Sequence, residues 1–245
     1  SPGGRWIVGE TRLFRSPRAA LLDTETGKWS WLSRCRASMA HWDQRWSPDG
    51  TELLWLSGRL IVPRPRFKFA QEEDFGQRFQ WWVTNLQSGR SRRIEKAFPE
   101  AGGLLKEDPS VVSGWLEQGY LVLYTGETVA FVDTTSGMVS KCRRPGDVWP
   151  WWFAARGVYG SAFSAEGKNG LEPRILHLYR FAPGLSDPEV IKVPAPENTR
   201  ELFVRSVSSD GGWAVAVSSA GMSSSEYDSV YWLMPVREGA ALTKI

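Results

Sequence analysis

The chain of 245 residues has few of the residues that usually build metal and nucleophilic sites. It contains two cysteines and two histidines, too few for a zinc cluster of known ligand spacing. Cys35 and Cys142 could pair, but each follows a different predicted outer strand, so two unpaired thiols are favoured over a disulfide. No apolar run approaches the ~20 residues of a membrane-spanning helix, so we expect no transmembrane span.

Recognisable catalytic motifs are also missing. No Gly-x-Ser-x-Gly sequence surrounds a serine, so no serine-hydrolase domain is predicted. Gly27-Lys28 and Gly167-Lys168 lack the spacing and the Ser or Thr of a phosphate-binding loop. We therefore predict no catalytic residue, metal site or cofactor, and favour a non-enzymatic role. An enzyme stays open as the alternative, because the acids of a glycosidase cannot be recognised from local spacing.

What the sequence does contain is tryptophan and an uneven distribution of charge. Fourteen residues are Trp, and the net charge is only +3. Residues 1–93 hold 16 Lys and Arg against 9 Asp and Glu, whereas residues 94–245 hold 14 against 18. This asymmetry suggests a one-sided electrostatic surface, with incidental drift as the alternative.

One stretch, Trp46-Ser47-Pro48-Asp49-Gly50 followed by an apolar run to Leu56, reads as strand, tight turn and strand. Pro48 presets φ for a turn, and Gly50 tolerates a positive φ. Diverged copies of the turn begin at Ser1 and Ser208. A second repeated turn links Asp or Asn to a Gly four residues later, at Asp23, Asn85 and Asp133, where the side chain can bond forward into the turn.

These two turns alternate with short apolar strands, which predicts radial four-stranded sheets. We therefore expect an all-β protein, a β-propeller of about five four-stranded blades in a single domain, residues 1–245, with almost no helix. The predicted blades cover residues 1–33, 41–95, 111–142, 149–193 and 202–245. Long loops are expected at several places, including Ser57 to Arg78 and Ile94 to Ser110.

The Trp-Ser-Pro-Asp-Gly turn with its apolar strand resembles the repeat of TolB-like β-propellers. The resemblance implies a propeller fold. It also implies a protein-interaction module or accessory subunit of an envelope or membrane-associated assembly, and favours the bacterial cell envelope or periplasm. Propellers of this kind also accompany peptidases. The alternative is therefore a carbohydrate-active or peptidase-associated propeller.

In such a blade the repeated tight turns share one face and the longer loops share the other. Since binding residues often lie on variable loops held by a rigid scaffold, we expect the long-loop face to bind a partner. Acidic residues 72–74 argue against a uniform nucleic-acid groove, so we expect a protein partner, with a membrane surface as a second candidate and a merely solvated surface as the alternative. The candidate partner-binding residues are Arg15, Arg18, Arg59, Arg64, Arg66, Phe67 and Phe69.

A Trp-rich channel mouth is the second candidate site. His41 and Asp43 could face one side of a strand, and Trp149 and Trp151 could stack on a sugar or clamp a peptide. Two ligands do not make a metal site, so a hydrogen-bonded pair and packing between sheets are the alternatives. His177 lies in an alternating strand and is expected to be structural.

The first blade is expected to lack its inner strand, because Ser1 begins at a turn that follows an inner strand in the second blade. An open sheet edge is a pairing liability. We therefore expect either that the native chain extends upstream or that another segment fills this position.

Overall fold

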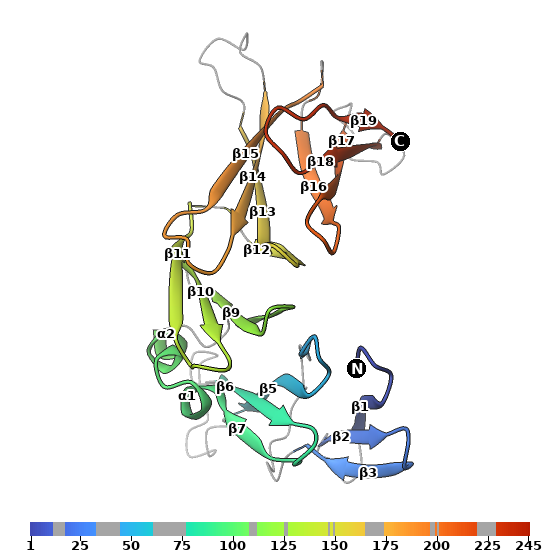
Figure 1. Cartoon of the computed structure of the whole chain (residues 1–245), viewed down its shortest axis with the longest axis vertical. Coiled ribbons are helices and arrows are strands. Elements are labelled where there is room, and N and C mark those ends of the chain that lie inside the picture. Colours follow the sequence, from blue (N-terminus) through green and yellow to red (C-terminus); the bar gives the residue numbers. More distant parts are fainter. Residues whose placement is uncertain are drawn as a thin grey trace, which may run out of the picture. The chain divides into compact units, whose positions relative to one another are not determined.

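The computed structural model of the chain describes residues 1–11, 18–32, 45–60, 77–107, 112–124, 127–146, 148, 150–164, 174–196, 199, 201–219 and 229–245. Within these ranges the strands form five sheets, one with three strands and four with four (Figure 1). In each sheet, strands adjacent in the sequence are also adjacent in space. This is the predicted all-β, blade-forming topology.

The first two sheets carry the two repeated turns. The first sheet contains β1 (Trp6–Thr11), β2 (Arg18–Asp23) and β3 (Lys28–Trp31). The second contains β4 (Arg45–Trp46), β5 (Glu52–Leu60), β6 (Gln77–Asn85) and β7 (Ser91–Arg93).

The remaining three sheets repeat the four-stranded order. The third contains β8 (Val112–Leu116), β9 (Tyr120–Tyr124), β10 (Thr128–Asp133) and β11 (Val139–Arg143). The fourth contains β12 (Pro150–Ala154), β13 (Gly157–Ser164), β14 (Ile175–Phe181) and β15 (Glu189–Pro194). The fifth contains β16 (Glu201–Val207), β17 (Trp213–Ser219), β18 (Ser229–Pro235) and β19 (Thr243–Lys244).

The repeated serine closes its turn in the same way three times. The hydroxyl of Ser47 accepts a hydrogen bond from the backbone N–H of Glu52 at 2.8 Å. Ser1 and Ser208 accept equivalent bonds, at 3.0 Å from Trp6 and at 2.9 Å from Trp213. β1 is therefore the counterpart of β5 and β17, which are second strands. Within the described residues the first sheet lacks a counterpart of β4, as predicted.

The chain packs as two compact units, and each has a core between neighbouring sheets. One unit contains residues 1–123 and 132–139, and the other contains residues 124–131 and 140–245. In the first unit, Leu21 and Leu32 pack with Leu53 and Trp55 of the second sheet. In the second unit, the core between the fourth and fifth sheets includes Tyr159, Leu176, Leu178, Leu202, Val204, Ala214, Ala216 and Met234.

The segment after β7 is not the simple loop that we expected. It forms two short helices, α1 (Ile94–Ala97) and α2 (Ala101–Glu107). Ile94, Phe98, Ala101 and Leu104 are all buried. Their spacing is close to the helical period, so one side of the segment packs inward.

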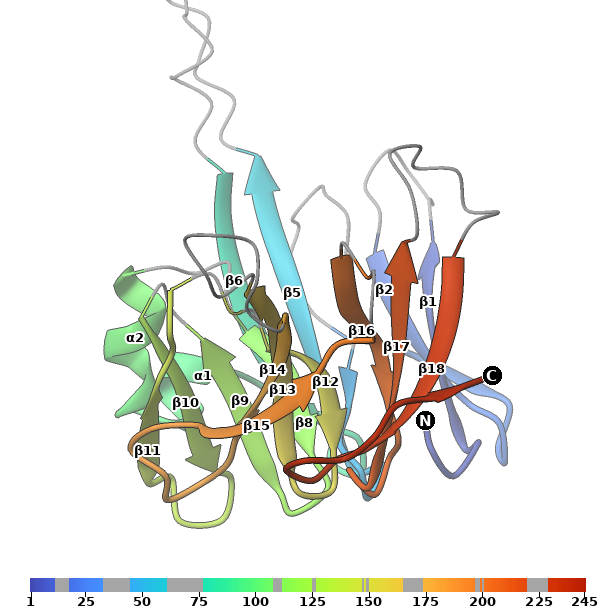
Figure 2. The same cartoon turned by 90° about the horizontal axis from the view of Figure 1, so that it is seen from above.

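The predicted insertion between β5 and β6 is also shorter than Ser57 to Arg78. The two strands pair over nine residues each, from Glu52 with Asn85 to Leu60 with Gln77. They extend further than β1 and β2 (Figure 2). Residues 57–60, 77 and 78 therefore belong to the hairpin. Within the described ranges no helix is long and apolar enough to cross a membrane.

Candidate interaction surfaces

Most of the predicted site residues lie outside the described part of the chain. Arg59 lies on β5, and Arg18 is the first residue of β2. The structure describes only the backbone of these two, so it does not test whether the predicted residues lie together. The remaining candidates outside the described residues are Arg15, His41, Asp43, Arg64, Arg66, Phe67, Phe69 and Trp149.

Trp151, from the predicted channel mouth, lies on β12 and is 64% exposed. Its neighbour Trp152 packs against the fifth sheet, where its indole N–H donates a hydrogen bond to the carbonyl of Arg205 at 3.0 Å. His177 on β14 lies 3.0 Å from the Ser164 hydroxyl and stacks near Tyr179. Among the described residues, no three His, Cys, Asp or Glu side chains gather as a metal site.

The tight turns of a sheet lie side by side, as predicted. The N–H of Leu86, after β6, donates to the carbonyl of Thr51, before β5, at 2.9 Å. In the third sheet Thr134 makes the same bond to Gly119 at 3.1 Å. These bonds hold the first and second repeated turns of a sheet on one face.

On this turn face, a cleft of about 480 Å³ lies between the first two sheets. Arg5 forms an ion pair with Asp23 at 3.3 Å and a second with Glu25 at 3.3 Å. Burial acts to raise the pKa of Asp23, but hydrogen bonds from Arg5 and from the backbone of Glu25 outweigh it, and the pKa lies below its ordinary value. Both groups of the pair therefore stay charged.

Asp49, across the cleft, is also held in a turn. The Ser47 hydroxyl donates to its carboxylate at 2.6 Å, and this bond is the main reason that the pKa of Asp49 is lowered. The backbone N–H and the hydroxyl of Thr51 add bonds at 3.0 and 2.8 Å. These carboxylates stabilise turns, so the cleft by itself does not indicate a ligand.

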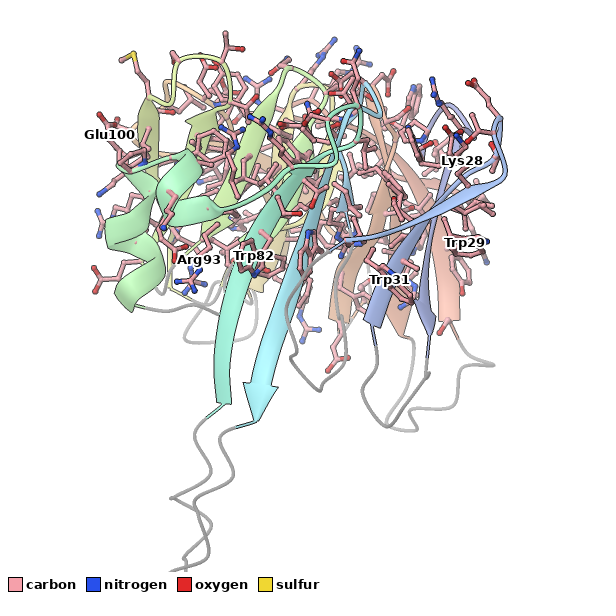
Figure 3. The ribbon with its side chains drawn as sticks, turned by 90° about the horizontal axis from the view of Figure 1, so that it is seen from below. Lys28, Trp29, Trp31, Trp82, Arg93 and Glu100 are labelled. Atoms are coloured by element: carbon pink, nitrogen blue, oxygen red, sulfur yellow. The ribbon has the colours of Figure 1, made fainter. Side chains whose placement is uncertain are left out.

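Apolar side chains are exposed instead on one face of the first sheet. We call the outward-facing residues Ile7, Leu22, Trp29 and Trp31 the first-sheet face. Ile7, Leu22 and Trp29 form one cross-strand row, and Ala20 pairs with Trp31 in the next. Trp29 is 61% exposed and Trp31 is 51% exposed. The two Trp side chains project from β3 beside Lys28 (Figure 3).

The opposite face of the same sheet is covered. Leu21, with Trp6 and Val8 beside it, packs toward the second sheet. Because successive side chains of a strand point to opposite faces, the alternation places Trp29 and Trp31 on the uncovered side. The first-sheet face is thus an aromatic surface on a regular sheet.

A second apolar face occurs on the fifth sheet. We call Phe203, Trp213, Val215, Val217, Tyr231 and Leu233 the fifth-sheet face. Phe203 pairs with Val217, and Val217 pairs with Tyr231, so three strands contribute to one row. Phe203, Trp213 and Tyr231 are between 44% and 47% exposed. The other side of these strands packs on the fourth sheet.

Neither face was predicted from the sequence, although a signal was present. Residues 213–217 and 230–234 are apolar without a break, and residues 6–8 form a shorter run. A sheet with one solvated face alternates apolar with polar residues, whereas continuous runs are typical of strands covered on both faces. The unbroken apolar runs therefore indicate that these strands carry apolar side chains on both faces of their sheets.

Comparisons with known proteins support the fold. No protein-family model matches the chain, and no curated protein matches it. Among solved structures, the β-propeller domain of the Trilobed protease from Pyrococcus furiosus matches with a TM-score of 0.54 and 15% identity, over 99% of this chain. Dipeptidyl peptidase 4 of Porphyromonas gingivalis matches with a TM-score of 0.61 and 11% identity over 99%. TolB from Acinetobacter baumannii matches with a TM-score of 0.45 and 12% identity over 97%.

The chain spans 68% of the first of these structures, 38% of the second and 51% of the third. The first two likenesses support the fold, and identities this low support nothing finer. The resemblance to TolB-like proteins is thus confirmed only at the level of the propeller. The chain has a β-propeller fold.

Proposed function

We propose that this chain is a non-enzymatic protein-interaction module, serving as an accessory subunit of an envelope or membrane-associated assembly. The observation that carries the proposal is the first-sheet face, where two Trp side chains are more than half exposed on a regular sheet. Large contiguous apolar patches on soluble proteins mark interaction sites. Trp is also the residue type most enriched among the anchors of protein interfaces.

The long segment predicted from Ser57 to Arg78, which we call the arm, is the second part of the proposed contact. Arg59, Arg64, Arg66, Phe67 and Phe69 lie on or beyond the β5–β6 hairpin, and Arg15 and Arg18 precede or begin β2. The nine-residue pairing of β5 with β6 supports this assignment, because the hairpin leads directly into the segment that holds most of these residues. Arg would bind carboxylates bidentately, and Phe would supply buried anchors.

Capture from an extract of the source cells tests the proposal. The parent chain is compared with Trp29→Gln/Trp31→Gln, with Arg59→Ser/Arg64→Ser/Arg66→Ser, and with the exposed-residue control Met138→Gln. One protein should be retained by the parent and the control, and about tenfold less by at least one of the other two. Equal retention by all four chains would contradict the proposal.

The alternative is a carbohydrate-active or peptidase-associated propeller with its site at the Trp-rich mouth. The exposure of Trp151 on β12 favours it, with Trp149, His41 and Asp43 as the other candidate lining residues. A screen of oligosaccharides by intrinsic tryptophan fluorescence, with Trp151→Ala as the matched variant, separates the two functions. Saturable binding that the variant loses would favour the alternative.

A further inference from the structure

We propose that Arg59 and Arg78 together bind a carboxylate from an acidic segment of a protein partner. We call these two residues the paired-arginine site. The inference rests on the proposed role in protein interaction, and it names the chemistry that one part of the arm recognises. It concerns a single hairpin of the second sheet, and it adds Arg78, which is not among the candidate residues predicted from the sequence.

The pairing of β5 with β6 places the two arginines directly opposite each other. Because successive residues of a strand alternate between faces, both belong to the sheet face that carries Trp55 and Trp82, which pair four residues further along each strand. The two indole rings stack with their centroids 5.7 Å apart, and Trp55 is fully buried. A register shift of one residue would break this stacked pair, so the Trp residues fix the pairing of the arginines.

Two like charges at this position disfavour the free hairpin. Residues directly opposite each other in an antiparallel pair have Cβ atoms about 5 Å apart, and like charges there are destabilising. A carboxylate bound between two guanidinium groups reverses this effect, because each planar group donates charge-assisted hydrogen bonds to it. The paired-arginine site therefore favours binding of an anionic group.

The register pairs on either side of the arginines contain only uncharged residues. They are Ser57 with Gln80, Gly58 with Phe79 and Leu60 with Gln77. The sequence between β1 and β2, residues 12–17, adds two Arg and no acidic residue. Acidic residues 72–74 lie in the segment between β5 and β6, outside the described part of the chain, and are the competing source of carboxylates. The described end of the hairpin is thus basic, which matches an acidic partner in charge.

An acidic protein segment fits this site better than a nucleic acid does. Nucleic-acid binding draws on many phosphate contacts along a basic surface, whereas β5 and β6 contain no Lys or Arg besides this pair. Acidic motifs of proteins are recognised by small clusters of Arg. One pair of arginines therefore matches one carboxylate of an acidic segment.

Fluorescence anisotropy of a labelled oligoglutamate peptide, at low salt to limit screening, tests the site. The parent should bind the peptide, and Arg59→Gln and Arg78→Gln should each weaken binding by about fivefold or more. Arg59→Gln/Arg78→Gln should weaken it by less than the product of the two single effects, because one carboxylate contacts both residues. Arg90→Gln is the control for net charge, since Arg90 is exposed beside β7 of the same sheet, and it should bind like the parent.

Thermal unfolding without the peptide shows whether the chain itself neutralises the two arginines. Arg78→Gln should leave the midpoint temperature unchanged or raise it, because the substitution removes a repulsion. A lowered midpoint would indicate that acidic groups of the chain, such as residues 72–74, already occupy the site, and it would overturn the proposal.

Three binding results would also overturn the proposal. They are no binding of the peptide by the parent, equal binding by the parent and both single variants, and tighter arginine-dependent binding of a single-stranded DNA oligonucleotide than of the peptide. Failure here is distinguishable from failure of the proposed function. The function holds if the parent captures a protein that Trp29→Gln/Trp31→Gln does not retain, and it fails if all chains in the capture experiment retain proteins equally.

Discussion

The serine that begins the first repeated tight turn forms the hydrogen bonds that close the turn. Ser47 is buried, and its hydroxyl both accepts from the N–H of Glu52 and donates to Asp49. Ser47→Ala removes both bonds and leaves the partly buried N–H of Glu52 without that acceptor. We expect the free energy of unfolding to fall by about 1–3 kcal/mol. Urea denaturation measures it, with the exposed Ser136→Ala as a control that should change stability by less than about 0.5 kcal/mol.

The same turn predicts a dependence of stability on pH. The pKa of Asp49 is lowered in the folded chain, first by the Ser47 hydroxyl. Its contribution is therefore present above the unfolded value of about 3.9 and lost as the pH falls through the lower folded value. The stability advantage of the parent over Asp49→Asn should be full near neutral pH and should shrink below about pH 4. An advantage that is constant with pH would contradict this.

Two glycines in equivalent turns differ in the space around them. Gly4 and Gly211 have φ of 71° and 70°. A Cβ at Gly4 would meet no atom within 4 Å, whereas one at Gly211 would lie 2.6 Å from the hydroxyl oxygen of Tyr159. Gly4→Ala should lower the free energy of unfolding only by the strain of a left-handed backbone, about 1–2 kcal/mol. Gly211→Ala should lower it clearly more, because the new Cβ also meets Tyr159. Adding Tyr159→Phe to the Gly211→Ala chain should restore part of the additional loss of stability, because it removes the hydroxyl that the Cβ meets. Equal costs, measured by thermal unfolding, would contradict the steric account.

These residues also show which contacts could be predicted from the sequence alone and which could not. The hydrogen bonds of the Ser47 and Asp133 turns follow from local sequence, since the donor and acceptor lie within five residues. Tyr159 and Gly211 are distant in sequence, and no local pattern encodes their contact between the fourth and fifth sheets.

At the scale of elements, a chain of hydroxyl groups links the second sheet to the first. The indole N–H of Trp55 donates to Thr84, which lies 2.8 Å from the Ser91 hydroxyl, and Ser91 donates to the carbonyl of Leu32. Thr84→Val removes the middle of this chain inside a buried region. We expect a loss of about 1–3 kcal/mol in the free energy of unfolding. Thr135→Val, in an exposed turn, is the control, and equal effects on stability would contradict the role of Thr84.

The helices α1 and α2 show where the element prediction was wrong. Pro99, Gly102 and Gly103 favour a loop in a chain otherwise organised by period-two strands. The buried residues Ile94, Phe98, Ala101 and Leu104 nevertheless follow the helical period. Tertiary burial of that side outweighs the weak helix propensity of the glycines.

At the scale of the whole molecule, the fold could be predicted because its two turns repeat and each repeat has a local cause. The candidate site could not be predicted to the same extent. Loop length, charge and aromatic content predict the arm and mouth residues, but they do not fix where side chains lie. Whether a sheet face is exposed depends on which sheets stack against each other. The pattern of apolar residues along a single strand predicts this stacking only in part.

The central claim is that the first-sheet face contacts a protein partner. Hydroxyl-radical footprinting with mass spectrometry, on the chain alone and with its captured partner, tests it most directly. We predict that oxidation of Trp29 and Trp31 falls on binding, whereas oxidation of the exposed Met138 does not change. Unchanged oxidation of both Trp side chains with the partner bound would contradict the claim.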